Sequence, residues 1–266
     1  DQLKSVVGQS EFSVAREPQL TSMYLAANMG QPMFQKVQVL QALKWAIDYE
    51  AIAKNITPNV WNVWQSVLPK GVPGAISDTP FKKDVAKAKA LLAQAGYPDG
   101  FSVTLDHFSN APYSVIAQAI QADLAAVGIK AQLLAGEHKQ VISKMRARQH
   151  QLVLQTWFPD YLDANSNMQA FAANPDDGDN SKLKILAWRC HFFDKELTAG
   201  VEEAAKELDT AKRMAMYAKM QRAFMERAPF VMLLQNAEVD VMRKGVAGIQ
   251  IGVLPDYTRY AAITKA

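Results

Sequence analysis

The stretch Gln155–Asp163 carries the side chains whose types and spacing best suit a binding site. Within it, Trp157 and Tyr161 flank one carboxylate, Asp160. The stretch directly follows Leu152–Leu154, an apolar run that predicts a strand, and ligands of open α/β sheets bind beyond the carboxyl ends of strands. A partly buried carboxylate at such a place can hold a ligand's ammonium group through a charge-assisted hydrogen bond. A plainer interpretation is equally open, in which Asp160 caps the following helix or pairs with an arginine of the chain.

Motifs for catalysis are absent from the sequence. It contains no glycine-rich phosphate loop, no dinucleotide fingerprint and no serine elbow. The four histidines are too scattered to form a metal pair, and the single cysteine, Cys190, excludes an internal disulfide framework. Cys190 and His191 are adjacent, so in a helix or strand their side chains point apart, and a small buried cysteine is the favoured interpretation. His107 follows a predicted strand, where it could face a cleft or be a solvated loop residue.

Three other groups of residues have both a structural and a functional interpretation. Asp176–Asp179 lacks the alternating spacing and closing Glu of a calcium loop, so we expect a solvated acidic turn. Trp61 and Trp64 could stack on a ligand or pin their own loop to the domain. Arg146 and Arg148 could reach a ligand carboxylate, but their polar surroundings favour solvated surface.

Composition and charge bound the class of protein. The 266 residues are 49% hydrophobic and 21% charged, which is typical of a globular chain with ample core. Lys+Arg 29 against Asp+Glu 26 gives a net charge of +3, too balanced for a dedicated nucleic-acid binder. No apolar run reaches the roughly 18 residues of a membrane-spanning helix. Because the first residue is Asp1 and not Met, we expect a processed chain, a truncated one or a fragment.

The first third of the chain predicts one strand, one helix and a long connection. Thr21–Ala27 is the first run with strand character. Over Val37–Ile56 apolar residues recur three or four positions apart, which predicts a helix buried on one face. Glycine and proline then accumulate over residues 57–80, the composition of an irregular connection, and connections of this length are often functional.

The middle of the chain alternates strands with helices. Asp84 predicts the cap of a helix that runs to Ala95 and ends at a left-handed Gly96. A second helix is predicted from Pro112 to Gly128. The strands are expected at Phe101–Leu105, Ile129–Leu133 and Leu152–Leu154, with a short helix carrying Val141 and Met145. This alternation predicts an α/β fold with a mostly parallel sheet flanked by helices.

Two helices, a buried strand and a tail make up the last third. One helix is expected over Lys195–Leu208 and another over Thr210–Arg227, capped by its first residue and stopped by Pro229. The fully apolar run Phe230–Leu234 predicts a buried strand. The tail Val246–Ala266 closes the chain.

Four blocks of sequence, in order, resemble one known family over nearly the whole chain. They are Gln41–Ile52, Ala86–Gly100, Trp157–Tyr161 and Asp209–Pro229. They resemble the extracytoplasmic solute-binding proteins of the peptide/opine/nickel class, family 5, which are the receptor components of ABC importers. Two positions depart from the family's pattern: Leu40 stands where an arginine is common, and Ala164 follows Asp163 in place of a proline.

The resemblance implies an incomplete receptor. It implies the second lobe of a two-lobed, type II periplasmic binding protein at residues 20–242, a segment 243–266 that returns to the first lobe, and a crossover at 1–19. A solute would be enclosed between the lobes by hinge closure and delivered to membrane permease subunits. It implies no catalysis, no metal and no cofactor, no nucleic-acid partner, and a periplasmic or otherwise extracytoplasmic location.

The same resemblance assigns a role to the stretch described first. In peptide binders the carboxylate at the position of Asp160 holds the ligand's amino terminus, with Trp157 nearby. The predicted ligand contacts are Asp160, Trp157, Tyr161, Phe158 and His107. The ligand stays open between a peptide, an opine and a related small solute. Two other classes also stay open: a stand-alone α/β interaction or sensor lobe, and a cofactor-independent hydrolase with Asp160 or His107 as its base.

Overall fold

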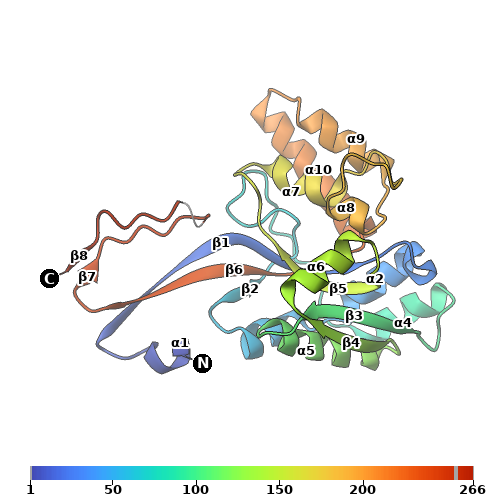
Figure 1. Ribbon diagram of the computed structural model, residues 1–266. Helices are drawn as coiled ribbons and strands as arrows, with labels where there is room; N and C mark the ends of the chain where they lie inside the picture. The colour runs from blue at the N-terminus through green and yellow to red at the C-terminus, as the bar shows by residue number, and fades with distance from the viewer. Residues whose placement is uncertain (1, 255–256, 266) are drawn as a thin grey trace.

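The centre of the protein is one mixed β-sheet, seen in a computed structural model that describes residues 2–254 and 257–265 (Figure 1). Its strands are β1 (Phe12–Ala27), β2 (Trp61–Val63), β3 (Ser102–Phe108), β4 (Lys130–Gly136), β5 (Leu152–Trp157) and β6 (Phe230–Arg243). They lie in the order β2-β6-β1-β5-β3-β4. β3 is parallel to β4 and β5, whereas β1 is antiparallel to β5 and β6, and β2 is antiparallel to β6. The α/β class is confirmed, and the parallel pairing is confined to the β5-β3-β4 part of the sheet.

Helices cover both faces of this sheet, and each face has its own core. The α-helices are α1 (Gln2–Val6), α2 (Val37–Ala46), α3 (Tyr49–Ala51), α4 (Val85–Gln94), α5 (Tyr113–Ala126), α6 (His138–Arg146), α7 (Ala164–Ala172), α8 (Leu186–Arg189), α9 (Lys195–Ala204) and α10 (Thr210–Arg227). A 3₁₀ helix, η1 (Pro32–Gln35), and a π-helix, η2 (Ile52–Ile56), accompany them. One core lies between the sheet and α2, α4 and α5, and the other between the sheet and α6 to α10 (Figure 1). Successive side chains of β1 enter opposite cores, Met23 and Leu25 the first and Tyr24 and Ala26 the second.

Helix ends that carry a capping residue or a glycine lie at or within one residue of the positions predicted from the sequence. The Asp84 side chain accepts the Lys87 N–H at 2.9 Å and starts α4, and Gly96 follows its end at φ +85°. α10 has the predicted bounds, but its cap is Asp209, which accepts the Lys212 N–H at 2.9 Å. The predicted cap at Thr210 is therefore wrong by one residue.

The helix predicted over Val37–Ile56 is broken. α2 ends at Ala46, and Asp48 begins a new turn because its side chain accepts the Ala51 N–H at 3.0 Å. The Asp48 N–H in turn donates to the carboxylate of Asp123 at 2.9 Å. The apolar spacing continues across this break, so periodicity alone did not reveal it.

Two strands are longer than their apolar runs, and together they form a ribbon that projects from the body (Figure 1). The ribbon pairs Phe12–Pro18 of β1 with Ala237–Arg243 of β6. At its far end two short strands, β7 (Val246–Ala247) and β8 (Thr264–Lys265), pair antiparallel. These half-exposed, polar stretches lacked the hydrophobic signal that predicted the buried ends of the same strands.

The tail returns from the ribbon's end to the body. Gln19 Nε2 donates to the Gly252 carbonyl at 2.6 Å, and the Leu20 N–H donates to the Val253 carbonyl at 3.2 Å. The structure thus docks Gly252 and Val253 beside β1. The division of the chain at residues 20 and 242 stays a prediction.

Candidate functional site

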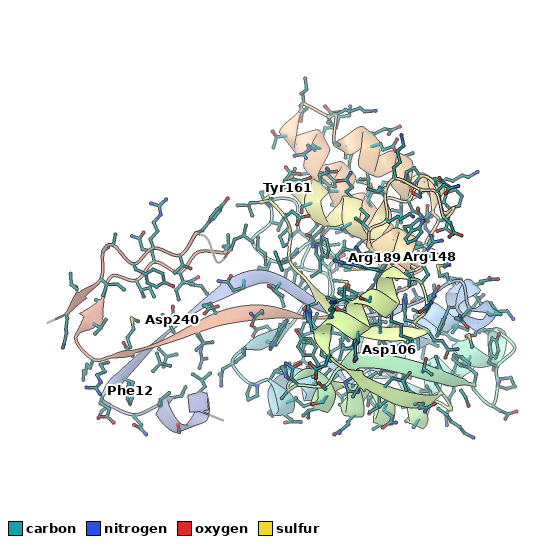
Figure 2. The ribbon with its side chains drawn as sticks, viewed as in Figure 1. Phe12, Asp106, Arg148, Tyr161, Arg189 and Asp240 are labelled. Atoms are coloured by element: carbon teal, nitrogen blue, oxygen red, sulfur yellow. The ribbon has the colours of Figure 1, made fainter. Side chains whose placement is uncertain are left out.

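Four of the five predicted ligand contacts lie in one exposed stretch, residues 157–162, which we call the cleft segment. It begins at the last residue of β5 and ends just before Asp163, the cap of α7. Phe158 is 60% exposed and Tyr161 46% exposed, and Asp160 between them is exposed as well. Figure 2 shows Tyr161 at the edge of the helical layer, on the side from which the ribbon projects.

The internal roles that the sequence allowed for Asp160 belong to Asp163. Asp163 accepts the Asn165 N–H at 2.8 Å, which caps α7, and two hydrogen bonds from Arg213 at 2.7 and 2.8 Å. Arg213 first, and then the Asn165 N–H, hold the pKa of Asp163 below its usual value. The Asp160 N–H donates to Ser166 Oγ at 2.9 Å, whereas its carboxylate makes no hydrogen bond or ion pair with the described residues. The backbone at Asp160 is therefore fixed while its charge stays available.

Trp157 joins the cleft segment to the core behind it. Its ring meets that of Phe171 in α7 edge-on, with centroids 6.2 Å apart. Its neighbour Thr156 places Oγ1 3.2 Å from the hydroxyl of Tyr113, which begins α5. Because Trp157 is only part-exposed and packs on Phe171, it holds the start of the segment against the protein.

His107 does not lie with the other four residues. It sits inside β3, is 3% exposed, and its Nδ1 is 2.8 Å from the Phe108 carbonyl oxygen. By strand alternation it shares the face of Val103 and Leu105, whereas Trp157 packs into the core on the opposite face. The solvated-loop interpretation is wrong, and the geometry brings no argument for His107 as a ligand contact, so that role stays a prediction.

In a second acidic stretch, Asp176–Asp179, the Asp177 side chain is tied into the fold, and the other three residues are exposed as predicted. Asp177 accepts from Arg148 at 2.6 Å and from Asn174 at 2.9 Å, and it lies 2.8 Å from His191 Nδ1. The prediction of a solvated turn is wrong for Asp177. It is wrong for Arg148 too, whose side chain is 8% exposed and lies 3.5 Å over the Trp188 ring.

Cys190 is not placed as a reactive thiol. Cys190 is buried, 3.8 Å from His150 Nε2, and burial raises the pKa of its thiol. His191 faces Asp177 rather than this thiol, as the sequence indicated. Within residues 2–254 and 257–265 no three His, Cys, Asp or Glu side chains are placed to hold a metal ion. In the same part of the chain no helix is long and apolar enough to cross a membrane.

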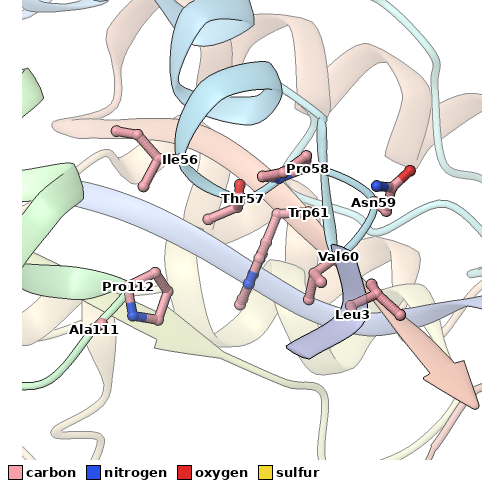
Figure 3. A pocket seen from close by; sticks show the side chains of 9 residues that line it. All are labelled: Leu3, Ile56, Thr57, Pro58, Asn59, Val60, Trp61, Ala111 and Pro112. Atoms are coloured by element: carbon pink, nitrogen blue, oxygen red, sulfur yellow. The ribbon is translucent and has the colours of Figure 1, made fainter. Parts of the chain in front are cut away.

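The two tryptophans of the long connection have different surroundings. Trp64 Nε1 donates to the Leu68 carbonyl at 2.8 Å and so pins its own loop. Trp61 instead lines a cavity of about 320 Å³ with Leu3, Ile56, Val60 and Pro112 (Figure 3). This cavity contains no residue of the cleft segment.

The side chains that hold the cleft segment were not identified from the sequence. They are Asn165 and Ser166 in the first turn of α7, and Arg213 and Tyr217 in α10. The pattern Asp163-Ala164-Asn165-Ser166 is a helix-start signal that could have placed α7 and two of these residues. The pairing with Arg213, 50 residues away, had no local signal.

Comparisons with known proteins agree on one family. The sequence model described as bacterial extracellular solute-binding proteins, family 5 Middle, matches residues 1–179. The chain is 27% identical over 258 residues to the "Dipeptide-binding protein" of Pseudomonas aeruginosa and 26% identical over 240 residues to the "Glutathione-binding protein GsiB" of Escherichia coli K12. A solved structure, the ABC transporter-associated periplasmic binding protein DppA from Helicobacter pylori with peptide STSA, aligns with a TM-score of 0.81 at 24% identity.

The same comparisons show how much of a relative this chain represents. The matches cover 94% and 90% of this chain but 46% of each curated relative. The aligned structure is covered over 48% of its length, by 93% of this chain. The chain therefore spans about half the length of the relatives it matches, and the fold it shares with the solved structure is that of a type II periplasmic binding protein.

Proposed function

The chain belongs to the bacterial extracellular solute-binding proteins of family 5, and we propose that it forms one wall of the solute site in the receptor of an ABC importer. Members of this family are substrate-binding components and not enzymes. In the proposed receptor, the cleft segment faces a second lobe, and the solute is enclosed between the two.

The carboxylate of Asp160 is the observation that carries this proposal. It is exposed, it lies between two exposed rings, and its backbone is held in place by Ser166. A carboxylate that the protein itself leaves unpaired suits a ligand with an ammonium group, and Phe158 and Tyr161 suit the apolar or cationic groups next to that ammonium. We therefore propose a peptide or a related amino-bearing solute, in keeping with the names of the curated relatives.

The partners and the location follow from the same proposal. Such a receptor binds its solute reversibly, performs no turnover, and presents the closed form to the permease subunits of its importer. Its place is outside the cytoplasm, in the periplasm or at the outer side of the membrane. The family's description as extracellular supports this location.

Calorimetric titration of the longer protein that contains this chain tests the proposal. The probes are the dipeptide Met-Leu and glutathione, each added to the unaltered protein and to Asp160→Asn. We expect Asp160→Asn to weaken binding by about 2–5 kcal/mol, because the ligand's ammonium loses its counter-charge once the proposed closure removes both groups from water.

A matched variant controls for the lost negative charge. Glu202→Gln removes an exposed carboxylate on α9, outside the cleft segment, and is expected to leave both affinities unchanged. Equal affinities for the unaltered protein and Asp160→Asn remove Asp160 from the site. Conversion of either probe into product, without an added cofactor, contradicts a receptor and favours a hydrolase.

A further inference from the structure

A continuous set of polar contacts runs from the cleft segment to α10, and it ends on Arg213. We propose that Arg213 is a positioning residue that, through Asp163, sets the geometry of Asp160 and Tyr161 for the ligand. This inference rests on the proposed function, because it concerns how the same site is held.

Every part of the Arg213 guanidinium is engaged. Nη1 and Nη2 donate to the two oxygens of Asp163 at 2.8 and 2.7 Å, in the forked geometry that only arginine can make. Nε donates to the carbonyl of Ala204, the last residue of α9, at 3.0 Å. Nη2 also lies 3.3 Å from the hydroxyl of Tyr217, one helical turn further along α10. Arg213 thus ties α9 and α10 to the start of α7.

Asp163 passes this constraint to the cleft segment. Its N–H donates to the Tyr161 carbonyl at 2.9 Å, and its own carbonyl accepts the Ser166 N–H at 3.1 Å. Ser166 in turn accepts the N–H of Asp160. Only the first turn of α7 therefore separates the Arg213 fork from the backbone that carries Asp160.

The second route leads to the ring of Tyr161. Asn165 Nδ2 donates to the Tyr161 hydroxyl at 3.2 Å, and Asn165 Oδ1 accepts from the Tyr217 hydroxyl at 3.4 Å. Tyr217 is the same residue that lies beside Arg213. The exposed ring is consequently oriented from its far end, although nearly half of its surface is open.

A binding site whose loop is already ordered loses less conformational entropy when the ligand binds. Loops that are ordered before the ligand arrives do not have to be ordered by it, so pre-organisation appears directly as affinity. The proposal predicts that breaking the fork loosens the cleft segment and weakens ligand binding while the rest of the fold stays intact.

Two variants remove the paired hydrogen bonds between Arg213 and Asp163 while keeping the other functions of each residue. Arg213→Lys keeps the positive charge but cannot make two parallel hydrogen bonds. Asp163→Asn keeps a good helix cap but loses the charge-assisted pair. The control is Arg222→Lys on the same helix, since Arg222 pairs with Asp78 at 2.9 Å, is exposed, and has no contact with the cleft segment.

Amide hydrogen exchange on this chain is the first measurement. We expect the amides of Asp160 and Asp163 to exchange at least about tenfold faster in Arg213→Lys and Asp163→Asn, with unchanged exchange in β3 and α4 and no change for Arg222→Lys. Unchanged exchange at Asp160 and Asp163 overturns the proposal. Faster exchange throughout the chain also overturns it, because Arg213 would then support the fold as a whole.

The second measurement is the affinity of Met-Leu for the longer protein. Both variants are expected to lower it about tenfold or more, and Arg222→Lys is expected to leave it unchanged. An unchanged affinity in the two variants overturns the positioning role. If the unaltered protein does not bind Met-Leu or glutathione, the proposed function fails for these solutes, while the exchange experiment still decides whether Arg213 orders the segment.

Discussion

Two acidic residues at similar loop positions, Asp160 and Asp177, have opposite relations to the rest of the protein. Asp177 accepts hydrogen bonds from Arg148 and Asn174 and faces His191, so its charge is used within the fold. Asp160 donates its backbone N–H to Ser166, and its carboxylate has no partner within residues 2–254 and 257–265. The difference teaches that neither residue type nor loop position decides whether a carboxylate serves the fold; its contacts within the folded chain do.

The largest expected effect is on the structural member of this pair. Asp177→Ala leaves the nearly buried guanidinium of Arg148 without its closest counter-charge. Because the Asp177 side chain is itself 29% exposed, we expect a loss of about 1–3 kcal/mol in the free energy of unfolding, less than for a fully buried pair. Urea denaturation followed by circular dichroism measures it. A loss below about 1 kcal/mol would place Asp177 among ordinary surface carboxylates and end the contrast with Asp160.

The stability of the Asp177 region is expected to depend on pH through His150. This buried histidine senses the charge of His191, which faces Asp177. Burial first, and then the charges of Lys144 and His191, lower the pKa of His150 to about 3. The unfolded histidine titrates near 6.5, so between pH 6.5 and 3 the unfolded chain binds the extra proton. Stability therefore falls as the pH falls, by up to about 1.4 kcal/mol per pH unit from this residue.

Comparison with a variant separates this contribution from that of the carboxylates. The free energy of unfolding is expected to fall less steeply between pH 7 and 4 for His150→Leu than for the unaltered chain. The difference in slope corresponds to about one bound proton. Identical slopes would mean that His150 becomes protonated without cost, in conflict with its burial beside Cys190.

The smallest expected effect belongs to Asp160. Asp160→Ala removes a carboxylate with no partner among the described residues, so the free energy of unfolding is expected to stay within about 0.5 kcal/mol of the unaltered value. The same denaturation measurement applies. A loss of 2 kcal/mol or more would show that Asp160 stabilises the fold, as Asp177 is expected to do.

The sequence predicted those parts of the fold whose signal is local. The cap at Asp84 and the end at Gly96 located α4, and the apolar runs located β3, β4 and β5. Asp160 was expected to be a partly buried carboxylate, whereas the structure exposes it. Periodicity could not detect the break at Asp48, because the apolar spacing continues across it.

Contacts between residues that are far apart in the sequence could not be predicted from local patterns. Arg148 was expected in solvent, yet its partner Asp177 lies 29 residues further on. The fork from Arg213 to Asp163 spans 50 residues, and nothing near either residue indicates the other. His107 was placed in a loop because the strand β3 extends beyond its alternating apolar residues, to Phe108. In each case the tertiary partner, and not the local pattern, decided the outcome.

The most direct test of the account asks whether Asp160 pairs with a ligand's ammonium group. Calorimetry on the longer protein compares Met-Leu with N-acetyl-Met-Leu, in which the ammonium is absent, for the unaltered protein and for Asp160→Asn. If Asp160 holds the ammonium, acetylation weakens binding by about an order of magnitude or more in the unaltered protein and has little further effect in Asp160→Asn. Equal losses on acetylation in both proteins would contradict it, because the ammonium would then be recognised elsewhere.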